Sequence, residues 1–362
     1  MKINVPTYIK LISDKFKDSG FEIYLVGGCV RDSILGKTPK DYDLTTNALP
    51  DKIVEILEPT GWKFNYQGAK FGIIAVFGKG LPKEGVEIAT FRSDLTKGRN
   101  LDVKMGVTIA DDVARRDLTI NALFYDTQKE EVVDLVGGLE DLKNGVIRMV
   151  GNPFERISED NLRIPRLIRF SSVLGFKIDT ETEKAVRNTL ALEGVSMERI
   201  WDEFDKSRKV MIEFLTLSDK LGMLDKYFPG VKLNKEFVKS DNYLIYLSNL
   251  FKYNNPKNLS KVLVDLKMRR DTADKIEFLV RFLNFDAKNV YSFWKNFSNF
   301  TIYPKTLLEW SEINNIKEIG EKFIKFKPIH NSEELMKNGF KGKSLGDEIL
   351  KIEENNFLNI TI

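Results

Sequence analysis

The chain of 362 residues is long enough for two or three domains, and its 42% hydrophobic content indicates that they fold around sizeable cores. Its 56 basic and 53 acidic residues leave a net charge of only +3, which excludes a uniformly basic surface, so any nucleic-acid partner would be bound by local patches. The single cysteine, Cys29, excludes an internal disulfide, and the single histidine, His330, excludes a histidine-based metal site.

The N-terminal segment is predicted to form an amphipathic helix. Residues 1–16, MKINVPTYIKLISDKF, carry apolar residues at helical spacing and lack the apolar core of a signal peptide. No apolar run elsewhere in the sequence is long enough to cross a bilayer. We therefore expect a cytoplasmic protein with no membrane partner.

Short strands and helices alternate over roughly the first 147 residues. Runs rich in β-branched and aromatic residues predict the strands, and Pro50 predicts the start of a helix over 51–57. From residue 158 onward, helical periodicity dominates. The pattern predicts an α+β fold, a small mixed β-sheet with helices on one face followed by an elongated all-helical part. The predicted strands are 23–26, 42–45, 71–77, 86–91 and 132–135.

A glycine turn and two alternating carboxylates follow the first predicted strand. Gly27 and Gly28 would let backbone N–H groups and a helix N-terminus approach a phosphate. In an extended strand, Asp41 and Asp43 point to the same face, where their charges repel unless a cation lies between them. Carboxylate oxygens beside a phosphate suit Mg²⁺. These residues predict a magnesium-dependent nucleotide enzyme, and the alternative is a solvated acidic pair after an ordinary turn.

The same stretch resembles the first motif of a known family. Residues 25–46, LVGGCVRDSILGKTPKDYDLTT, are similar to LVGGxVRDxLLGxxxxDxDxxT of the class II template-independent nucleotidyltransferases. That family comprises the tRNA nucleotidyltransferases (CCA-adding enzymes) and the bacterial poly(A) polymerases. The resemblance implies that Asp41 and Asp43 are catalytic metal ligands and that Gly27, Gly28 and Arg31 bind the nucleotide.

The resemblance also implies the organisation of the whole chain. It predicts a nucleotidyltransferase head at 1–147, a helical neck with a nucleotide-templating helix at 148–215, and a helical, tRNA-binding body and tail at 216–362.

A second motif lies at 115–125, RRDLTINALFY, and resembles the family's RRDxTxNALxY. Two guanidinium groups can clamp a phosphate, and the polar residues after them can hold a ribose hydroxyl. Taken alone, such a run is equally typical of an exposed helix edge. By the resemblance, Arg116 contacts the nucleotide, and Asp117 and Asn121 hold the sugar or order the site.

A third motif at 159–170, EDNLRIPRLIRF, is similar to the family's EDxLRxLRxxRF. Cytosine and adenine both present an amine donor beside a ring-nitrogen acceptor, so a carboxylate and a guanidinium would select them together. Asp160 and Arg163 stand at i and i+3, where one helix face can offer both, and the alternative is a surface ion pair. The resemblance adds Arg166 and Arg169 as nucleotide-binding residues. Pro165, where the family has a straight-chain residue, is expected to kink this helix.

The sequence does not determine whether the chain would add all of CCA, only CC or only the terminal A. The polar segment 93–106 occupies the place of the family's loop that helps switch from C to A addition, and it lacks the usual pattern although Lys97 and Arg99 keep basic character. Glu87 is a candidate third catalytic carboxylate from a neighbouring strand. In the helical part, Lys267, Arg269 and Arg270 could face RNA phosphates or form a solvated helix face.

The sequence therefore predicts an enzyme that adds C and A nucleotides to the 3′ end of tRNA from CTP and ATP, with two Mg²⁺ ions and release of pyrophosphate. A poly(A) polymerase, an enzyme that adds only CC or only A, and a non-catalytic RNA-binding descendant are the alternatives. The oligomeric state stays open.

Overall fold

The computed structural model describes residues 2–96, 102–300 and 302–362, without the side chains of 298–300. The chain divides into two compact units, Met1–Ser196 and Met197–Ile362. The boundary falls inside the predicted neck segment 148–215, and the division into three parts at 147 and 215 stays a prediction.

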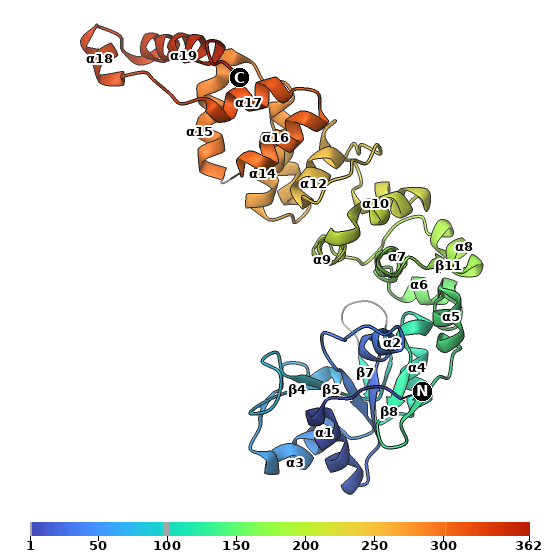
Figure 1. The fold of residues 1–362 in the computed structure, drawn as a ribbon. Helices are drawn as coiled ribbons and strands as arrows, with labels where there is room; N and C mark the ends of the chain where they lie inside the picture. The colour runs from blue at the N-terminus through green and yellow to red at the C-terminus, as the bar shows by residue number, and fades with distance from the viewer. Residues whose placement is uncertain (1, 97–101, 301) are drawn as a thin grey trace. The chain divides into compact units, whose positions relative to one another are not determined.

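The first unit is built on a mixed sheet of seven strands in the order β3-β4-β5-β2-β1-β8-β9 (Figure 1). Strand β2 runs parallel to β5, and the other neighbours are antiparallel. The predicted α+β fold is confirmed. The strands are β1 (Ile23–Val26), β2 (Leu44–Thr46), β3 (Lys63–Asn65), β4 (Ile73–Phe77), β5 (Val86–Thr90), β8 (Phe124–Asp126) and β9 (Glu131–Val133).

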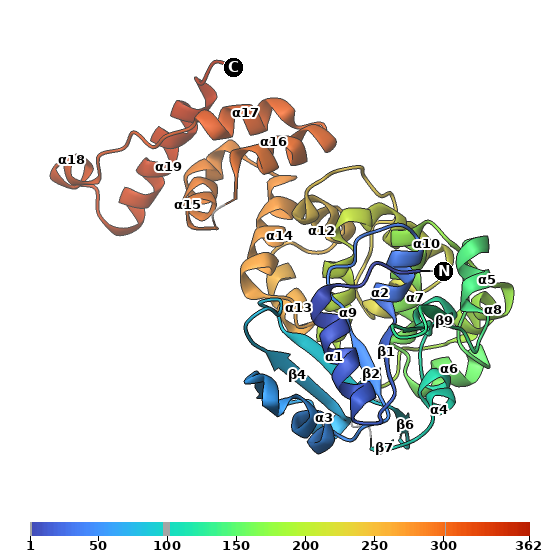
Figure 2. The ribbon, with the colours of Figure 1, turned by 60° about the horizontal axis from the view of Figure 1, so that its bottom comes forward.

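Strand β1 lies in the interior of the sheet because its residues are apolar. Leu25 pairs with Leu44 of β2 on one side and with Tyr125 of β8 on the other. Helix α1 (Thr7–Asp18) buries Ile9 and Phe16 at helical spacing, and it packs against β1 and α3 (Pro50–Leu57) (Figure 2). The sheet thereby brings the turn after β1 beside the residues that precede β2.

Four predicted strands have different bounds in the structure. Strand β2 spans Leu44–Thr46 instead of 42–45, and strand β5 ends at Thr90 instead of 91. Strand β4 begins at Ile73 because the preceding Ala69–Phe71 form a 3₁₀ turn. Strand β9 ends at Val133 because the next side chain, Asp134, accepts N–H groups from the chain ahead and turns it into a helix. The predicted strands did not include β3, which forms one edge of the sheet, or β8, which lies next to β1.

The rest of the first unit consists of short elements that follow or flank the sheet. Strands β6 and β7 form an antiparallel pair, and β10 and β11 form a parallel one. These elements are α2 (Gly28–Ile34), β6 (Arg92–Asp94), β7 (Val103–Met105), α4 (Ile109–Ala114), η3 (Thr119–Asn121), α5 (Gly138–Asn144), β10 (Val146–Ile147), α6 (Pro153–Glu159), α7 (Arg163–Leu174), β11 (Lys177–Ile178) and α8 (Thr180–Asn188).

Helix α5 fixes the short helix η3. A Cβ atom at Gly138 would lie 2.3 Å from the carbonyl oxygen of Thr119, so only glycine allows this approach. The hydroxyl of Thr119 also donates to Asp141 at 2.7 Å. Helix η3 is therefore tied to α5 at two points, and it ends at Asn121.

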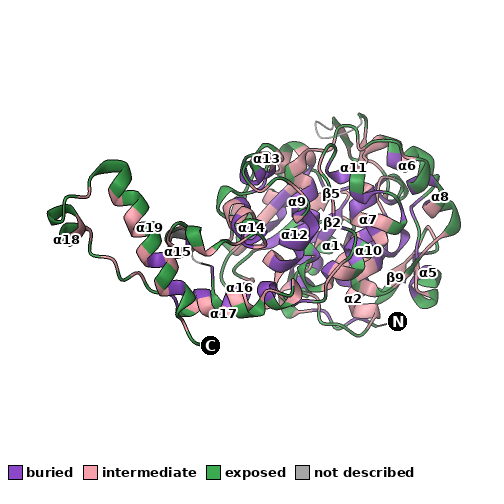
Figure 3. Ribbon diagram, turned by 90° about the horizontal axis from the view of Figure 1, so that it is seen from above, coloured by how far each residue is buried: buried purple, intermediate pink, exposed green. Residues whose placement is uncertain are grey.

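The described residues of the second unit form helices without named strands. Its buried residues concentrate on helices such as α12 and α14 (Figure 3). Its α-helices are α9 (Met197–Lys206), α10 (Met211–Lys220), α11 (Leu224–Tyr227), α12 (Tyr243–Phe251), α13 (Leu259–Asp265), α14 (Arg270–Phe282), α15 (Val290–Phe300), α16 (Pro304–Ile313), α17 (Lys317–Lys325), α18 (Ser332–Lys337) and α19 (Gly342–Leu358).

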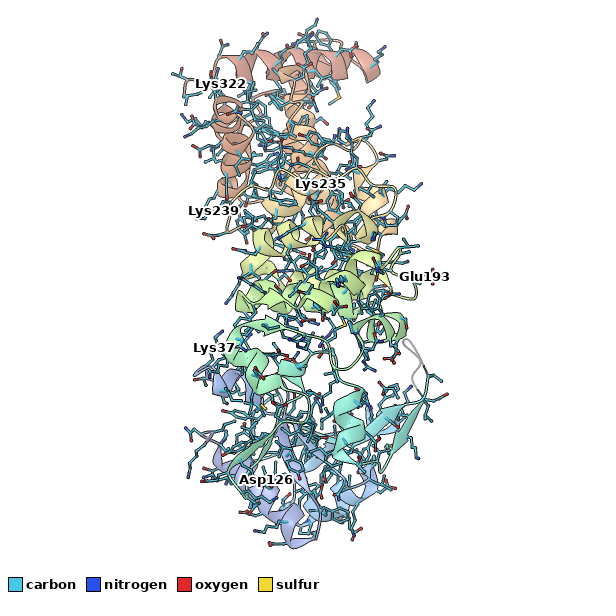
Figure 4. The ribbon with its side chains drawn as sticks, turned by 90° about the vertical axis from the view of Figure 1, so that its right-hand side faces the viewer. Lys37, Asp126, Glu193, Lys235, Lys239 and Lys322 are labelled. Atoms are coloured by element: carbon cyan, nitrogen blue, oxygen red, sulfur yellow. The ribbon has the colours of Figure 1, made fainter. Side chains whose placement is uncertain are left out.

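Several lysines of the second unit lie outside helices. Lys235 and Lys239, both labelled in Figure 4, belong to the irregular segment 231–240. Lys235 pairs with Asp219 at 2.8 Å and with Asp225 at 2.7 Å. Lys267 lies between α13 and α14, and the predicted RNA contacts of this region stay predictions. Over the ranges that the structure describes, no helix is long and apolar enough to cross a membrane.

Candidate functional site

The glycine turn joins β1 to α2 in a conformation that suits glycine alone. Gly27 has φ of +73° and donates its N–H to the Leu123 carbonyl at 3.1 Å. A Cβ atom at Gly27 would lie 3.8 Å from Nη1 of Arg116, and one at Gly28 would lie 3.7 Å from Nη2 of Arg31. Two guanidinium groups therefore flank a turn that has no side chains of its own.

The two predicted metal ligands lie beside this turn, immediately before β2. The carbonyl of Asp43 accepts the N–H of Val26 at 3.0 Å, which holds the carboxylate next to the end of β1. Asp41 is exposed and Asp43 is half-buried. Burial, followed by the negative charges of Asp41 and Glu87, raises the pKa of the Asp43 carboxyl to about 6, although the Arg116 guanidinium opposes the shift.

The register of the sheet explains the influence of Glu87. In the parallel pair of β2 and β5, Leu44 faces Ile88, so the residues before them, Asp43 and Glu87, are also neighbours. Even so, the described part of the chain contains no group of three acidic, cysteine or histidine side chains close enough together to hold a metal ion. The role of Glu87 as a third catalytic carboxylate stays a prediction.

The donor set of Asp41 and Asp43 fits a divalent cation. Both offer only carboxylate oxygen, and their mutual repulsion raises the pKa of Asp43, which is the electrostatic situation that a bound cation relieves. Hard cations such as Mg²⁺ are commonly held by one or two carboxylates, with water and phosphate completing the coordination shell.

A buried carboxylate, Asp112, holds the second motif in place. Its oxygens accept from Nε of Arg115 at 2.9 Å and from Nη2 of Arg116 at 2.8 Å, and its side chain is fully buried. Burial by itself would raise the pKa of Asp112, but the two guanidinium groups hold it below its usual value. The guanidinium of Arg116 also lies 4.8 Å from the centre of the Phe124 ring. Arg116 is thus fixed with Nη1 toward the glycine turn.

Hydrogen bonds link the first, second and third motifs in one chain of side chains. Nη1 of Arg31 donates to Oδ1 of Asn121, and the amide nitrogen of Asn121 donates to Asp117 at 3.3 Å. Asp117 in turn accepts from Nη2 of Arg166 at 2.7 Å. Burial would raise the pKa of Asp117, but Arg166 and the N–H donors around it lower it. The predicted residues Arg31, Asn121, Asp117 and Arg166 therefore belong to one site.

The predicted templating residues occupy a break between two helices, and the expectation of one continuous helix face is wrong. Helix α6 ends at Glu159 and α7 begins at Arg163. The carboxylate of Asp160 accepts the N–H of Leu162 at 3.0 Å, a local bond that competes with helix formation. The side chain of Arg163 donates to Glu159 at 2.7 Å and to the Arg115 carbonyl at 3.2 Å. The nucleotide roles of Asp160 and Arg163 stay predictions.

Pro165 does not kink a helix, contrary to the sequence-based expectation. It lies in the first turn of α7, where its missing N–H breaks no hydrogen bond of the helix interior. Helix α7 continues from Arg163 to Leu174. Because the helix starts only after Asp160, Arg166 and Arg169 belong to α7 whereas Asp160 precedes it.

Comparison with known proteins agrees with these motifs. Residues 23–148 match the Poly A polymerase head domain, and residues 175–233 match the probable RNA and SrmB-binding site of polymerase A. The CCA-adding enzyme of Ligilactobacillus salivarius is 35% identical over 83% of this chain and 70% of its own length. That of Leuconostoc mesenteroides is 32% identical over 94% of this chain and 90% of its own length. The chain belongs to the CCA-adding enzyme and poly(A) polymerase family.

Poly(A) polymerases of the family match a smaller part of their length. Poly(A) polymerase I of Haemophilus influenzae is 33% identical over 61% of this chain and 51% of its own length. Among solved structures, the Bacillus stearothermophilus CCA-adding enzyme in complex with CTP has a TM-score of 0.65, 25% identity and coverage of 95% of this chain and 91% of its own. The Thermotoga maritima CCA-adding enzyme complexed with tRNA_CCA shares the fold, with a TM-score of 0.69, 22% identity and coverage of 99% and 93%.

Family membership bears on the metal, since nucleotidyltransferases of this family generally use divalent metal ions. The segment 93–106 occupies the place of the family's loop, and the structure describes its residues 93–96 and 102–106. Strands β6 and β7 include its two ends, whereas Lys97 and Arg99 lie outside the described residues.

Sequence reasoning missed several side chains that shape the site. Asp112 could have been found, because it precedes Arg116 by four residues, the spacing of an ion pair on a helix. Arg156 donates to the Arg115 carbonyl at 2.6 Å and pairs with Glu159, which ties α6 to the second motif. Phe124 and Phe170 carry no polar signal, and only the three-dimensional structure brings Phe124 to Arg116 and Phe170 to Arg31.

Proposed function

We infer that this protein is a tRNA nucleotidyltransferase that adds C and A nucleotides to the 3′ end of tRNA from CTP and ATP and releases pyrophosphate. One observation carries the inference. The hydrogen-bonded chain from Arg31 through Asn121 and Asp117 to Arg166 joins the three nucleotide motifs beside the acidic pair. The relatives matched over most of their length, from Ligilactobacillus and Leuconostoc, are CCA-adding enzymes.

The reaction is an in-line attack of the RNA 3′-hydroxyl on the α-phosphate of the nucleotide, in which pyrophosphate leaves. Asp41 and Asp43 would hold Mg²⁺, which in this position activates the hydroxyl and stabilises the leaving oxygen. Gly27 and Gly28 present a turn without side chains to the phosphates, and Arg31 and Arg116 flank it as donors. These groups orient the triphosphate before the hydroxyl arrives.

Base selection is assigned to the break between α6 and α7. The carboxylate of Asp160 would accept from the amine of cytosine or adenine, and the guanidinium of Arg163 would donate to the ring nitrogen. Support comes from the bonds that fix Arg163 to Glu159 and to the Arg115 carbonyl, since a guanidinium held in one place can read a hydrogen-bond pattern. Uracil and guanine present the opposite pattern and would be rejected.

The decisive experiment uses three tRNA substrates, ending before the first C, before the second C and before the A. Labelled CTP and ATP are supplied with Mg²⁺, and the products are sequenced. Complete CCA ends from all three substrates support the inference. Growth of a long A tail from ATP alone would instead identify a poly(A) polymerase, and extension of only one class would identify a CC-adding or A-adding enzyme.

Asp160→Asn provides the matching test of base selection. An amide can present either a donor or an acceptor, so this variant is expected to incorporate UTP alongside CTP. Unchanged discrimination against UTP and GTP would contradict the role of Asp160. A suitable control is Asp51→Asn, which removes a carboxylate from the exposed first turn of α3. A cytoplasmic location, the place of tRNA end processing, is part of the same proposal.

A further inference from the structure

One aromatic ring, that of Phe170, lies close to three arginines of the candidate site. The guanidinium carbons of Arg31, Arg166 and Arg169 lie 5.0, 5.7 and 4.1 Å from the centre of the Phe170 ring. Arg31 belongs to α2, whereas the other two share α7 with Phe170. Cations within about 6 Å of a ring centre are attracted by its quadrupole. A single ring thus connects arginines from two motifs.

Packing of the core does not account for Phe170. Helix α7 turns Ile164, Leu167 and Ile168 inward, at the spacing of a buried stripe. Phe170 is only half-buried, like Arg166, which precedes it by one helical turn. The ring therefore belongs to the face of α7 that carries the arginines.

An aromatic ring holds a guanidinium differently from a carboxylate. A carboxylate neutralises the charge and occupies N–H donors, so it competes with a phosphate for the same group. A ring attracts the cation through its π-electrons and leaves the N–H donors available. Arg31 makes both kinds of contact. Its Nε and Nη2 each lie 2.8 Å from Oδ1 of Asp32, and Nη1 donates to Asn121, yet Nη1 and Nη2 each carry a second N–H.

We propose that Phe170 is a positioning residue that, together with the carboxylates of Asp32 and Asp117, holds Arg31, Arg166 and Arg169 together against their mutual repulsion and orients this cluster toward the triphosphate of the incoming nucleotide. The inference rests on the proposed function and deepens it, because it assigns this cluster to the phosphates and leaves the base to Asp160 and Arg163. The ring acts through the arginines and touches no reacting atom.

Phe170→Leu tests the proposal because it keeps an apolar side chain and removes the ring. We expect the KM values for CTP and ATP to rise together by roughly 5- to 30-fold, with a smaller change in kcat. The inhibition constant of pyrophosphate should rise by the same factor, since this probe has phosphates and no base. Discrimination against UTP and GTP should not change. Phe170→Tyr retains the ring and should stay within about twofold of the wild type.

Phe154→Leu is the matched control. Phe154 is 44% exposed on α6, so the same chemical change there should alter neither KM nor the inhibition constant. Circular dichroism establishes that each variant is folded, and Phe170→Met replaces the leucine variant if the latter is unfolded at the assay temperature. An unchanged inhibition constant of pyrophosphate in Phe170→Leu would overturn the proposal. An equal rise of this constant in Phe170→Leu and Phe170→Tyr would overturn it as well.

Calorimetric titration of pyrophosphate into the full-length protein separates this inference from the proposed function. Weaker binding to Phe170→Leu than to the wild type supports the positioning role even without turnover. Failure of the wild type to incorporate CTP into tRNA would overturn the proposed function alone. Equal pyrophosphate binding by both proteins, together with normal CCA addition by the wild type, would overturn only the role of Phe170.

Discussion

The two units stabilise their interiors with different chemistry. In the first unit, buried or half-buried carboxylates lie next to the candidate site. Asp112 forms ion pairs with two arginines, and Asp117 forms one with a third. In the second unit, aromatic rings fill the interior. Phe282 lies 5.1 Å from both Phe285 and Phe323, measured between ring centres. Charges fixed in advance are suited to binding a charged ligand, whereas burial of aromatic rings contributes to stability.

The second unit also buries a carboxylate, and the comparison with Asp112 is instructive. Glu353 is fully buried and accepts the backbone N–H groups of Ile329 and His330, each at 2.8 Å. Burial would raise the pKa of Glu353, but these donors and the His330 ring lower it. This carboxylate joins chain segments, whereas Asp112 fixes Arg116, whose Nη1 lies near the glycine turn. The same chemical group, a buried carboxylate, thus joins chain segments in one unit and fixes an arginine beside the candidate site in the other.

The largest expected effect is on the chemistry itself. Asp41→Asn should reduce nucleotide incorporation by about 1,000-fold or more, because it removes one of two oxygen ligands for the cation. Folding should be retained, since the Asp41 side chain is exposed. Incorporation of labelled CTP and thermal unfolding measure the two properties. Substantial residual incorporation would contradict the metal assignment.

The next largest effect is expected at the buried carboxylate of the second motif. Asp112→Asn should lower the free energy of unfolding by about 3–5 kcal/mol, because two arginines lose their counter-charge, and it should weaken CTP binding through Arg116. Denaturant unfolding and CTP titration measure both changes. The neighbouring Asp111→Asn is the control, since Asp111 is exposed and only contributes to the capping box of α4, so its replacement should change stability far less than that of Asp112.

A substitution in the second unit should separate stability from binding. Phe282→Ala leaves a cavity among aromatic rings and should cost about 3–5 kcal/mol of stability. The dissociation constant of CTP should be unchanged, since the nucleotide motifs lie in the first unit. Calorimetric unfolding with CTP titration tests this contrast. A weakened CTP affinity would show that the second unit contributes to the nucleotide site.

The smallest expected effect concerns pH. With a folded pKa of about 6, above its ordinary value of 3.8, Asp43 binds a proton more tightly in the folded state. Its stabilising contribution is complete below about pH 4 and is lost as pH rises through about 6. In EDTA at pH 7.5, the free energy of unfolding of Asp43→Asn should therefore exceed that of the wild type by on the order of 1–2 kcal/mol, after allowance for partial exposure. Thermal unfolding measures this difference as a higher unfolding temperature of the variant.

The difference between these two proteins should vanish well below pH 3.8, where the carboxyl of the wild type is protonated in the folded and unfolded states alike. Mg²⁺ should reverse the order at pH 7.5 by stabilising only the wild type. Equal stability at all pH values would contradict the electrostatic strain assigned to Asp43. Asp18→Asn, at the exposed end of α1, is the control.

The sequence determined much of the first unit because its signals are local. The apolar run of β1, the glycines after it and the spacing of Asp41 and Asp43 lie within about twenty residues. Neighbouring residues therefore predict both the local backbone conformation and the functional groups that it carries. The same holds for the helical character after residue 158. The break after Glu159 was missed because the helical pattern of the sequence continues across it. In the structure, a local hydrogen bond from the Leu162 N–H to Asp160 competes with the helix there.

Only the tertiary structure decided which side chains meet. The bond from Arg31 to Asn121 spans 90 positions, and that from Arg166 to Asp117 spans 49. Neither spacing has a local signature, because both depend on the pairing of β1 with β8 and on the packing of α7. The role of Phe170 is the clearest case, since its sequence position predicts an apolar side chain. Arg166 and Arg169 lie near the ring because they share α7 with it, whereas Arg31 reaches it only because α2 and α7 are brought together, and the attraction between a cation and a ring acts only at that short range.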